Sequence, residues 1–168
     1  MPFYWGAYMD NVEIIPACEC HMDSVSKIAI DAWTPIREEF KKLLGEEVYN
    51  SQFTDWQSKK TESVKKQLLS GKGYVAIMNN KVAGFISYMI HADTNTGEIL
   101  ANAVSVDARG MGIGSKMYDF VTDKMKAEGA EFVTVHTGLD DAHAPARRAY
   151  EKAGFSASLP SIQYYKKL

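Results

Sequence analysis

The first half of the chain has one short strand pattern followed by long helical periodicity. Residues 12–14 alternate between apolar and polar types and are stopped by Pro16, which predicts a short strand. Apolar residues then recur at helical spacing in three stretches, which begin at Asp23 or Ser24, at Ile36 and at Thr54 and end before Pro35, at Gly45 and at Gly71. Pro35 is expected to break or kink the helix, because proline lacks the backbone donor that a helix interior uses.

The second half alternates between strand and helix patterns. Strand-like runs cover residues 74–78, 82–91, 98–106, 132–137 and 162–165, and helical runs cover residues 112–129 and 145–154. Asn79, Asn80 and Lys81 are expected to form a tight hairpin turn between the first two of these strands. A second cluster of turn residues, 93–97, leads into the third strand. Three strands joined by short turns predict an antiparallel meander.

The order of the elements predicts an α/β fold on one mixed sheet. One strand and three helices precede the meander, and a helix, a strand, a helix and a last strand follow it. The helix at residues 112–129 lies between two strands, which predicts a single β-α-β crossover beside the central antiparallel strands. With 168 residues, the chain fits one domain covering residues 1–168.

Charged residues are nearly balanced over the whole chain. There are 19 Lys and Arg against 21 Asp and Glu, for a formal net charge of −2. A protein that coats nucleic acid needs a large basic excess, so no nucleic acid is expected as a partner. Residues 1–50 carry 4 basic and 9 acidic side chains, a local −5, whereas residues 51–84 carry 6 and 2, a local +4. No run reaches the roughly 18 apolar residues of a membrane span, so no membrane association is expected.

The cysteines and the N-terminus indicate a cytoplasmic protein. Cys18 and Cys20 are separated by one residue, which is a poor disulfide framework, so a reducing cytoplasm is expected. Together with His21 they are three potential metal ligands, but without a second cluster they fall short of a structural zinc site, and no metal is expected. Residues Met1 to Trp5 lack the basic head and apolar run of a signal peptide.

The strongest chemical signal is a glycine-rich segment between a predicted strand and a predicted helix. Gly110, Gly112 and Gly114 alternate with Met111 and Ile113. Glycines let the backbone curl so that several N–H groups point into one space, and a helix N-terminus adds about half a positive charge. Together they predict a site for a phosphate or pyrophosphate group. The alternative is a turn that only permits tight packing.

Comparison with known glycine-containing motifs narrows the range of phosphate ligands that this segment is expected to bind. The dinucleotide fingerprint needs glycine at position 115, where this chain has Ser115. A P-loop needs glycine, lysine and then serine or threonine, whereas the order here is Gly114, Ser115, Lys116. The nucleophile elbow G-x-S-x-G is absent from the chain. A dinucleotide-binding protein is therefore disfavoured.

Two segments resemble the signatures of the GCN5-related N-acetyltransferase (GNAT) family. Residues 109–114, RGMGIG, match R/Q-x-x-G-x-G/A, and residues 143–155 resemble N-x-x-A-x-x-x-Y-x-K-x-G-F. His143 stands where the family most often has asparagine. The resemblance is clear over about residues 72–168 and weaker at residues 12–17. It implies the GNAT-like acyl-CoA N-acyltransferase fold, in which two neighbouring strands splay apart to hold the cofactor.

The resemblance implies acetyl-coenzyme A (acetyl-CoA) as the cofactor and acetyl donor. Its pyrophosphate is expected on the backbone amides of residues 109–115. Its pantetheine arm is expected between the strands at residues 98–106 and 132–137, as a ligand that adds to a strand. The expected cofactor-binding residues are Val104, Ser105, Val106, Arg109, Gly110, Met111, Gly112, Ile113, Gly114, Ser115, His143 and Tyr150. For His143, both cofactor contact and helix capping are expected roles.

The resemblance also implies acetyl transfer to a primary amine by direct attack in a ternary complex. Tyr150 takes the position of the family's signature tyrosine and is expected to be the general acid for the departing thiolate. A phenol pKa of about 10 against a thiol pKa of about 8.5 makes this transfer uphill by only ~2 kcal/mol. Glu98 is the candidate base, with a water chain, His91 and His136 as alternatives. The backbone N–H of Val104 is the expected donor to the oxyanion.

The acceptor is less well defined by the sequence. A small-molecule or peptide amine is expected, and a homodimer is expected as the assembly. Six aromatic residues are candidates for a pocket or for the core: Trp33, Tyr49, Phe53, Trp56, Tyr164 and Tyr165. Acidic residues such as Glu38, Glu39, Glu46 and Glu47 suit a cationic acceptor, or form a solvated helix face. The alternative function is a non-catalytic acyl-CoA-binding sensor.

Overall fold

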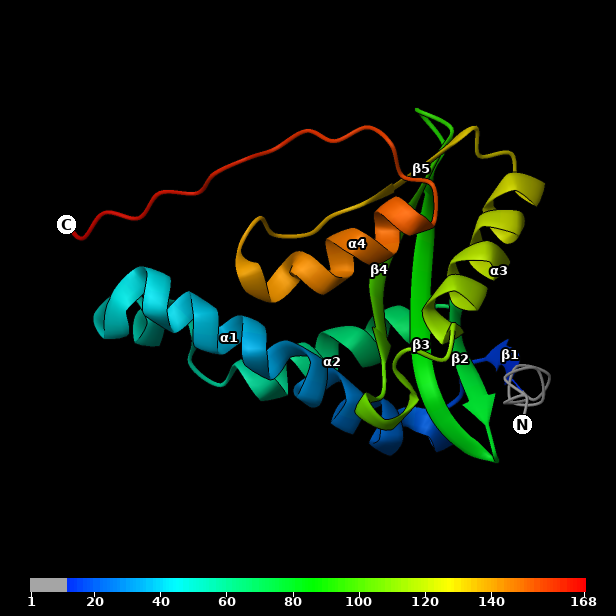
Figure 1. Cartoon of the computed structure of the whole chain (residues 1–168), viewed down its shortest axis with the longest axis horizontal. Coiled ribbons are helices and arrows are strands. Elements are labelled where there is room, and N and C mark those ends of the chain that lie inside the picture. Colours follow the sequence, from blue (N-terminus) through cyan, green and yellow to red (C-terminus); the bar gives the residue numbers. More distant parts are fainter. Residues whose placement is uncertain (1–11) are drawn as a thin grey trace, which may run out of the picture.

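The computed structural model describes residues 12–168 (Figure 1). In chain order the elements are β1 (Val12–Pro16), η2 (Glu19–His21), α1 (Met22–Phe53), α2 (Trp56–Leu68), β2 (Gly73–Met78), β3 (Lys81–His91), β4 (Thr96–Val104), η3 (Val106–Ala108), α3 (Ile113–Ala127), β5 (Phe132–Val135), η4 (Asp141–His143) and α4 (Ala144–Lys152). Residues Met1 to Trp5, which entered the prediction of localisation, lie outside the described residues. Within residues 12–168, no helix is long and apolar enough to cross a membrane.

A five-stranded sheet in the order β1-β2-β3-β4-β5 forms the centre of the fold. The strands from β1 to β4 pair antiparallel, and β4 and β5 pair parallel. The connection from β4 to β5 runs through α3, so the predicted crossover and mixed sheet are confirmed (Figure 1). Asn79 and Asn80 have φ angles of 51° and 59°, which the predicted hairpin turn requires.

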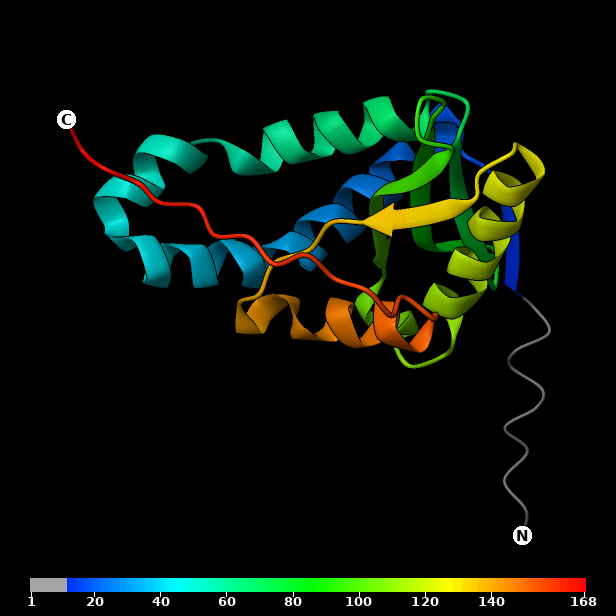
Figure 2. The same cartoon turned by 90° about the horizontal axis from the view of Figure 1, so that it is seen from above.

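The sheet separates two apolar cores. On one face, Met117 and Val121 of α3 pack with Tyr150 of α4. On the other face, Val25 of α1 packs with Val64 of α2. Both faces of the central strands are therefore buried, as a sheet covered on both sides requires. Beyond the sheet, α1 and α2 continue side by side for several turns (Figure 2).

The predicted break at Pro35 is wrong, and the break lies at Gly45. α1 runs through Pro35 without leaving helical geometry. Gly45, where the second helix was predicted to end, has φ 75° and ψ 163°, which interrupts the helix within Met22–Phe53. A proline removes one donor and can be absorbed in a long helix, whereas a left-handed residue turns the chain out of helical geometry. The helix axis therefore changes direction at the glycine.

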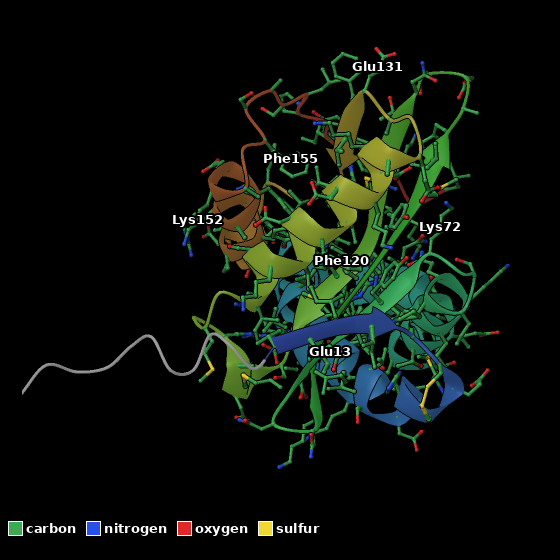
Figure 3. All side chains as sticks on the ribbon, turned by 90° about the vertical axis from the view of Figure 1, so that its right-hand side faces the viewer. Glu13, Lys72, Phe120, Glu131, Lys152 and Phe155 are labelled. Atoms are coloured by element: carbon green, nitrogen blue, oxygen red, sulfur yellow. A yellow bond between two sulfur atoms is a disulfide. The ribbon has the colours of Figure 1, made fainter. Side chains whose placement is uncertain are left out.

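The prediction that Cys18 and Cys20 make a poor disulfide framework is also wrong, because the two are joined by a disulfide (Figure 3). The short helix η2 turns the chain between them and holds their Cα atoms 5.3 Å apart, within the usual disulfide range. Although these sulfurs and His21 cluster within 4.8 Å, a disulfide sulfur is not the thiolate that binds metal. The cytoplasmic prediction thereby loses its support from the cysteines.

The last predicted strand, at residues 162–165, is absent. Residues 155–168 follow α4 as an extended segment without helix or strand, and this segment runs over α4 toward the far part of α1 (Figure 2). A strand needs a neighbouring strand to satisfy its backbone groups, and this segment pairs with no described strand. Two other strands are shorter than predicted. β4 ends at Val104 and β5 at Val135, each two residues before its predicted end.

Candidate active site

Of the two strands that flank the crossover, β4 continues well beyond the end of β5. Parallel pairing of β4 with β5 runs only from Thr96 with Phe132 to Ile99 with Val135. β4 continues to Val104 while β5 ends. The second half of β4 therefore has a partner strand only on its β3 side. This is the splayed arrangement that the sequence resemblance implies.

Backbone donors of β4 face the open side. The N–H of Ser105 donates to the carbonyl of Ala83 at 2.8 Å, and the N–H of Ala101 donates to Ser87 Oγ at 3.3 Å, both toward β3. Because successive N–H groups of a strand alternate in direction, those of Asn102 and Val104 point away from β3. Val106 lies in η3, so its predicted place in the strand at residues 98–106 is wrong.

A β-bulge in β4 reverses which face of the sheet the odd- and even-numbered side chains occupy. Ser87 pairs with Ala101 and the next residue, Tyr88, pairs with Ile99, which leaves Leu100 without an opposite residue. Ile99 therefore lies in the α3 core, while Ala101 lies in the α1–α2 core. Without the bulge, residues 99 and 101 would share one face.

Tyr150 is held in a buried hydrogen-bonded chain that Asn102 connects. The Asn102 amide donates to Tyr150 Oη at 3.1 Å and accepts from Tyr118 Oη at 2.9 Å. The rings of Tyr118 and Tyr150 lie 5.6 Å apart, and Phe155, beside α4 in Figure 3, packs on Tyr150 at 5.8 Å. Because Tyr150 accepts a hydrogen bond here, its own O–H is available to a group outside this chain of residues.

Burial keeps both tyrosine hydroxyls protonated. Desolvation raises the pKa of Tyr150, and hydrogen bonds from Asn102 and Tyr118 offset part of that rise. Desolvation and the neighbouring Tyr150 raise the pKa of Tyr118. At neutral pH, Tyr150 is therefore a hydrogen-bond donor and not a phenolate.

Glu98 forms a pair with His91. His91 Nε2 lies 2.6 Å from Glu98 Oε2, and the side chains are 37 % and 31 % exposed. Gly97 and Ile99 face α3, since a Cβ at Gly97 would meet Met125 of that helix. Glu98 therefore faces the side of α1 and α2. The structure does not bring Glu98 and Tyr150 together, because they lie on opposite faces of β4. Glu98 precedes the residue at which pairing with β5 ends, and Asn102, the partner of Tyr150, follows it.

The glycine segment turns as predicted. Gly110 and Gly112 have φ angles of 76° and 75°, a backbone conformation that other residues adopt at a cost of about 1–2 kcal/mol. Gly112 is the N-cap of α3, which begins at Ile113. The first N–H groups of that helix have no acceptor inside the helix. Ile113 itself is buried in the core, so its contribution to a ligand site is its backbone, while Arg109 and Met111 are exposed.

His143 is engaged by Asp140 and does not cap α4 with its side chain. Nδ1 of His143 lies 2.6 Å from Asp140 Oδ2, and the backbone N–H of His143 donates to Asp140 Oδ1 at 3.3 Å. Glycine is required at position 138, because a Cβ there would lie 2.5 Å from His143 Nδ1. His143 is the N-cap residue of α4 by position, as predicted, but its side chain makes no capping hydrogen bond. The side chain that caps the short helix η4 is that of Asp140.

Asn102 is a site residue that the sequence motifs did not predict. It is a polar residue in the otherwise apolar run from Ile99 to Val104, and this interruption was the available signal. Its importance comes from the bulge, which turns it toward α3 and α4. His136, one of the alternative bases, lies just after β5 and is exposed.

Residues 34–155 match the protein family described as the acetyltransferase (GNAT) family. No curated protein matches the chain. The PaiA N-acetyltransferase of Thermoplasma acidophilum, solved in complex with coenzyme A, is 18 % identical with a TM-score of 0.68, and the match covers 88 % of this chain and 91 % of that one.

Two further solved structures share the fold. Ard1 of Thermoplasma volcanium is 22 % identical with a TM-score of 0.62, covering 88 % of this chain and 84 % of its own. A transcriptional regulator of Bacillus halodurans C-125 is 18 % identical with a TM-score of 0.64, covering 93 % and 100 %. At these identities the similarity shows the fold alone.

Proposed function

The chain belongs to the acetyltransferase (GNAT) family, and on this premise we propose that it transfers the acetyl group of acetyl-CoA to a primary amine. In this proposal the amine attacks directly within a ternary complex of both substrates and protein. The observation that carries the proposal is the splayed pair β4 and β5, with the Tyr150 hydroxyl on one face and Glu98 on the other.

The residues around the splayed strands fit acetyl-CoA. The second half of β4 is open on the side away from β3, where the amide-containing pantetheine arm would pair as an added strand does and would leave the Val104 N–H for the acetyl group. Gly110 and Gly112 adopt the conformations that expose successive N–H groups, and α3 begins beside them. The backbone N–H groups from Arg109 to Ser115 would hold the pyrophosphate. When bound, the cofactor supplies an acetyl thioester.

Tyr150 is proposed to hold the proton that the departing thiolate needs. Its hydroxyl accepts from Asn102, which fixes the oxygen and leaves the O–H directed elsewhere. Because burial raises its pKa, the tyrosine stabilises a thiolate first as a hydrogen-bond donor. The Val104 N–H is the proposed donor to the developing oxyanion, which needs no reorganisation because a strand backbone is rigid.

Glu98 is proposed to accept the proton of the amine, directly or through water. It faces α1 and α2, so the amine would approach from that side while the thioester lies on the side of α3 and α4. His91 Nε2, 2.6 Å from the carboxylate, holds Glu98 in one orientation. Glu98 and His91 were separate candidates in the sequence, and in this proposal they act as one pair.

Replacing Tyr150 by phenylalanine tests this proposal. Y150F removes one hydroxyl, so kcat should fall about 10²–10⁴-fold, the range for a lost general acid. The affinity for coenzyme A should change less than about threefold, because the ring and the backbone contacts remain. Coenzyme A release in the presence of a panel of amines measures kcat, and calorimetry measures cofactor binding.

Tyr118→Phe is the matched control, since it removes a neighbouring hydroxyl of the same hydrogen-bonded chain. Its kcat should stay within about tenfold of the parent. Unchanged turnover in Y150F would contradict the role of Tyr150. Tight coenzyme A binding without turnover on any amine would instead favour the non-catalytic sensor.

A further inference from the structure

A hollow lies away from the splayed strands, where α1 and α2 extend beyond the sheet. Its volume is about 250 Å³. Its walls include the cations Arg37, Lys59 and Lys60 and the aromatic rings of Phe53 and Trp56, with no acidic residue among the lining side chains. The volume is below the roughly 300–1,000 Å³ of a complete small-molecule site. The hollow can therefore hold one part of a substrate.

The Arg37 guanidinium is half-buried among rings and lacks a counter-charge. Its carbon lies 4.5 Å from the ring centre of Phe53 and 5.7 Å from that of Trp56. Arg37 Nε is buried with no hydrogen-bond partner, and none of the ion pairs among residues 12–168 includes Arg37. The titratable groups that act on the pKa of Arg37 are Tyr49 and Tyr165, and a neutral phenol supplies no negative charge.

Lys60 adds a second uncompensated charge. Its Nζ lies 3.7 Å from the ring centre of Trp33. Burial, together with the positive charge of Arg37, lowers the pKa of Lys60 to about 8. No carboxylate among the described residues forms an ion pair with Lys60 or with Lys59. Aromatic faces offset only about 0.5–2 kcal/mol for each cation, so the cluster lacks an anion.

Two other basic residues of α1, Lys41 and Lys42, do have acidic partners. Lys41 lies 2.8 Å from Glu46, and Lys42 lies 3.2 Å from Glu39. Glu47 pairs with Lys167 of the C-terminal segment. Three of the four acidic residues that suited a cationic acceptor in the sequence, Glu39, Glu46 and Glu47, are thus partnered at the surface. Unpaired charge at the α1–α2 hollow is positive.

A chain of contacts connects the hollow to the candidate active site. Arg37 also lies over the ring of Phe40 at 5.4 Å, and Phe40 lies 6.1 Å from the His143 ring at the start of α4. The hollow is lined by the same two helices that Glu98 faces. A substrate whose amine reaches Glu98 from this side would extend its far end toward Arg37.

We propose that the hollow lined by Arg37, Lys59 and Lys60 binds an oxyanion, a carboxylate or phosphate, carried by the amine substrate. The acceptor is then an amine with an anionic end and not a polycation. Charge-assisted hydrogen bonds from a guanidinium and an ammonium suit both oxyanions, and the aromatic walls suit a short apolar linker. This inference rests on the proposed function, because it assigns the acceptor class of that site.

Two pairs of amines, each differing mainly in the oxyanion, test the proposal by calorimetry on the full chain. O-phosphoethanolamine is compared with ethanolamine, and β-alanine with propylamine, at about 10 mM ionic strength, where charges are weakly screened. In at least one pair, the oxyanion-bearing member should bind about tenfold more tightly. The pair that shows the preference distinguishes phosphate from carboxylate.

Variants assign any preference to the hollow. R37Q and K60Q should each abolish the preference, while R37K should retain part of it. Lys27→Gln is the matched control, because Lys27 is an exposed cation on the same helix α1, away from the hollow. If R37Q or K60Q fails to fold, K59Q, at an exposed lining residue, should still reduce the preference severalfold.

Equal binding of both members of each pair, no binding at all, or an equal loss in K27Q would overturn the inference. Coenzyme A release separates this failure from failure of the proposed function. Release with propylamine and ethanolamine but no oxyanion preference would reject only the inference. Oxyanion-dependent binding without release from any amine would reject only acetyl transfer.

Discussion

The pairing of Glu98 with His91 shows how one residue's role depends on another seven positions away. β3 and β4 are antiparallel neighbours joined by a short turn, so the two side chains meet on one face. The residue types alone do not predict that His91 and Glu98 are in contact. In the proposed function, this contact is the reason to prefer Glu98 over the other three candidate bases.

Glu98→Gln should lower kcat by about 10²-fold or more, because glutamine keeps the size of the side chain but accepts no proton. His91→Gln should cost less, about tenfold, since it disturbs only the orientation of Glu98. Steady-state kinetics at saturating acetyl-CoA measures both. His136→Gln is the control at an alternative base, and a large loss there with none in E98Q would contradict the assignment.

Lys60 predicts a pH-dependent stability. Its pKa in the folded protein is about 8, below the ordinary value of 10.5, so the folded state binds fewer protons than the unfolded state between these values. Stability therefore rises with pH across this window, and the charged lysine destabilises the fold in full below about pH 8.

Lys60→Met should accordingly raise the melting temperature at pH 7 and lose that advantage as the pH approaches 10.5. Thermal melts at pH 7, 8, 9 and 10 measure the trend. Lys59→Met, at an exposed neighbour, should show no such pH dependence. A K60M variant that is less stable than the parent at every pH would contradict the assigned cause.

At the scale of elements, two glycines at the start of α3, Gly112 and Gly114, have different roles. Gly112 needs glycine for its positive φ, whereas Gly114 has ordinary helical geometry and its nearest neighbours to a Cβ lie 3.9 Å away. The first glycine serves the fold of the turn. The second leaves room for a ligand to approach the backbone.

Gly112→Ala should destabilise the protein by about 1–2 kcal/mol, because alanine is strained in that conformation. Gly114→Ala should keep or slightly raise stability, since alanine favours helix by about 1 kcal/mol over glycine. Both should weaken coenzyme A binding. Thermal melts and calorimetry separate the two effects, and full cofactor affinity in G114A would argue against close approach of the pyrophosphate.

Helices and strands form as predicted where periodicity and turn residues are enough to define them. They differ from the prediction where the element depends on a neighbouring strand or helix. The meander, the crossover helix and the helix at Pro145 were predictable from periodicity and turn residues. The strand expected at residues 162–165 was not, because alternation cannot show whether a neighbouring strand is present. Pro35 shows the same limit, since a long helix tolerates a residue that would end a short one.

For the whole molecule, the homodimer stays a prediction. Leu159 is 95 % exposed and Ile162 is 75 % exposed in the extended C-terminal segment, and Phe132 on the edge strand β5 is 68 % exposed. Exposed apolar side chains along an unpaired edge favour association with a second copy. Light scattering should give twice the 18.7 kDa of one chain. A mass of one chain at high concentration would contradict a dimer.

By itself the sequence determined the family, the antiparallel meander with its one crossover, and the glycine segment, because each rests on residues close together in the chain. It also contained the positive block at residues 51–84, without indicating what the charge does. Only the tertiary structure decided that Asn102 meets Tyr150, that Glu98 meets His91, and that Lys60 lies beside Arg37. These contacts depend on a bulge in β4 and on two helices packing together. Contacts between residues far apart in the chain determine how buried each side chain is and which charges surround it, and these properties cannot be predicted from the local sequence pattern.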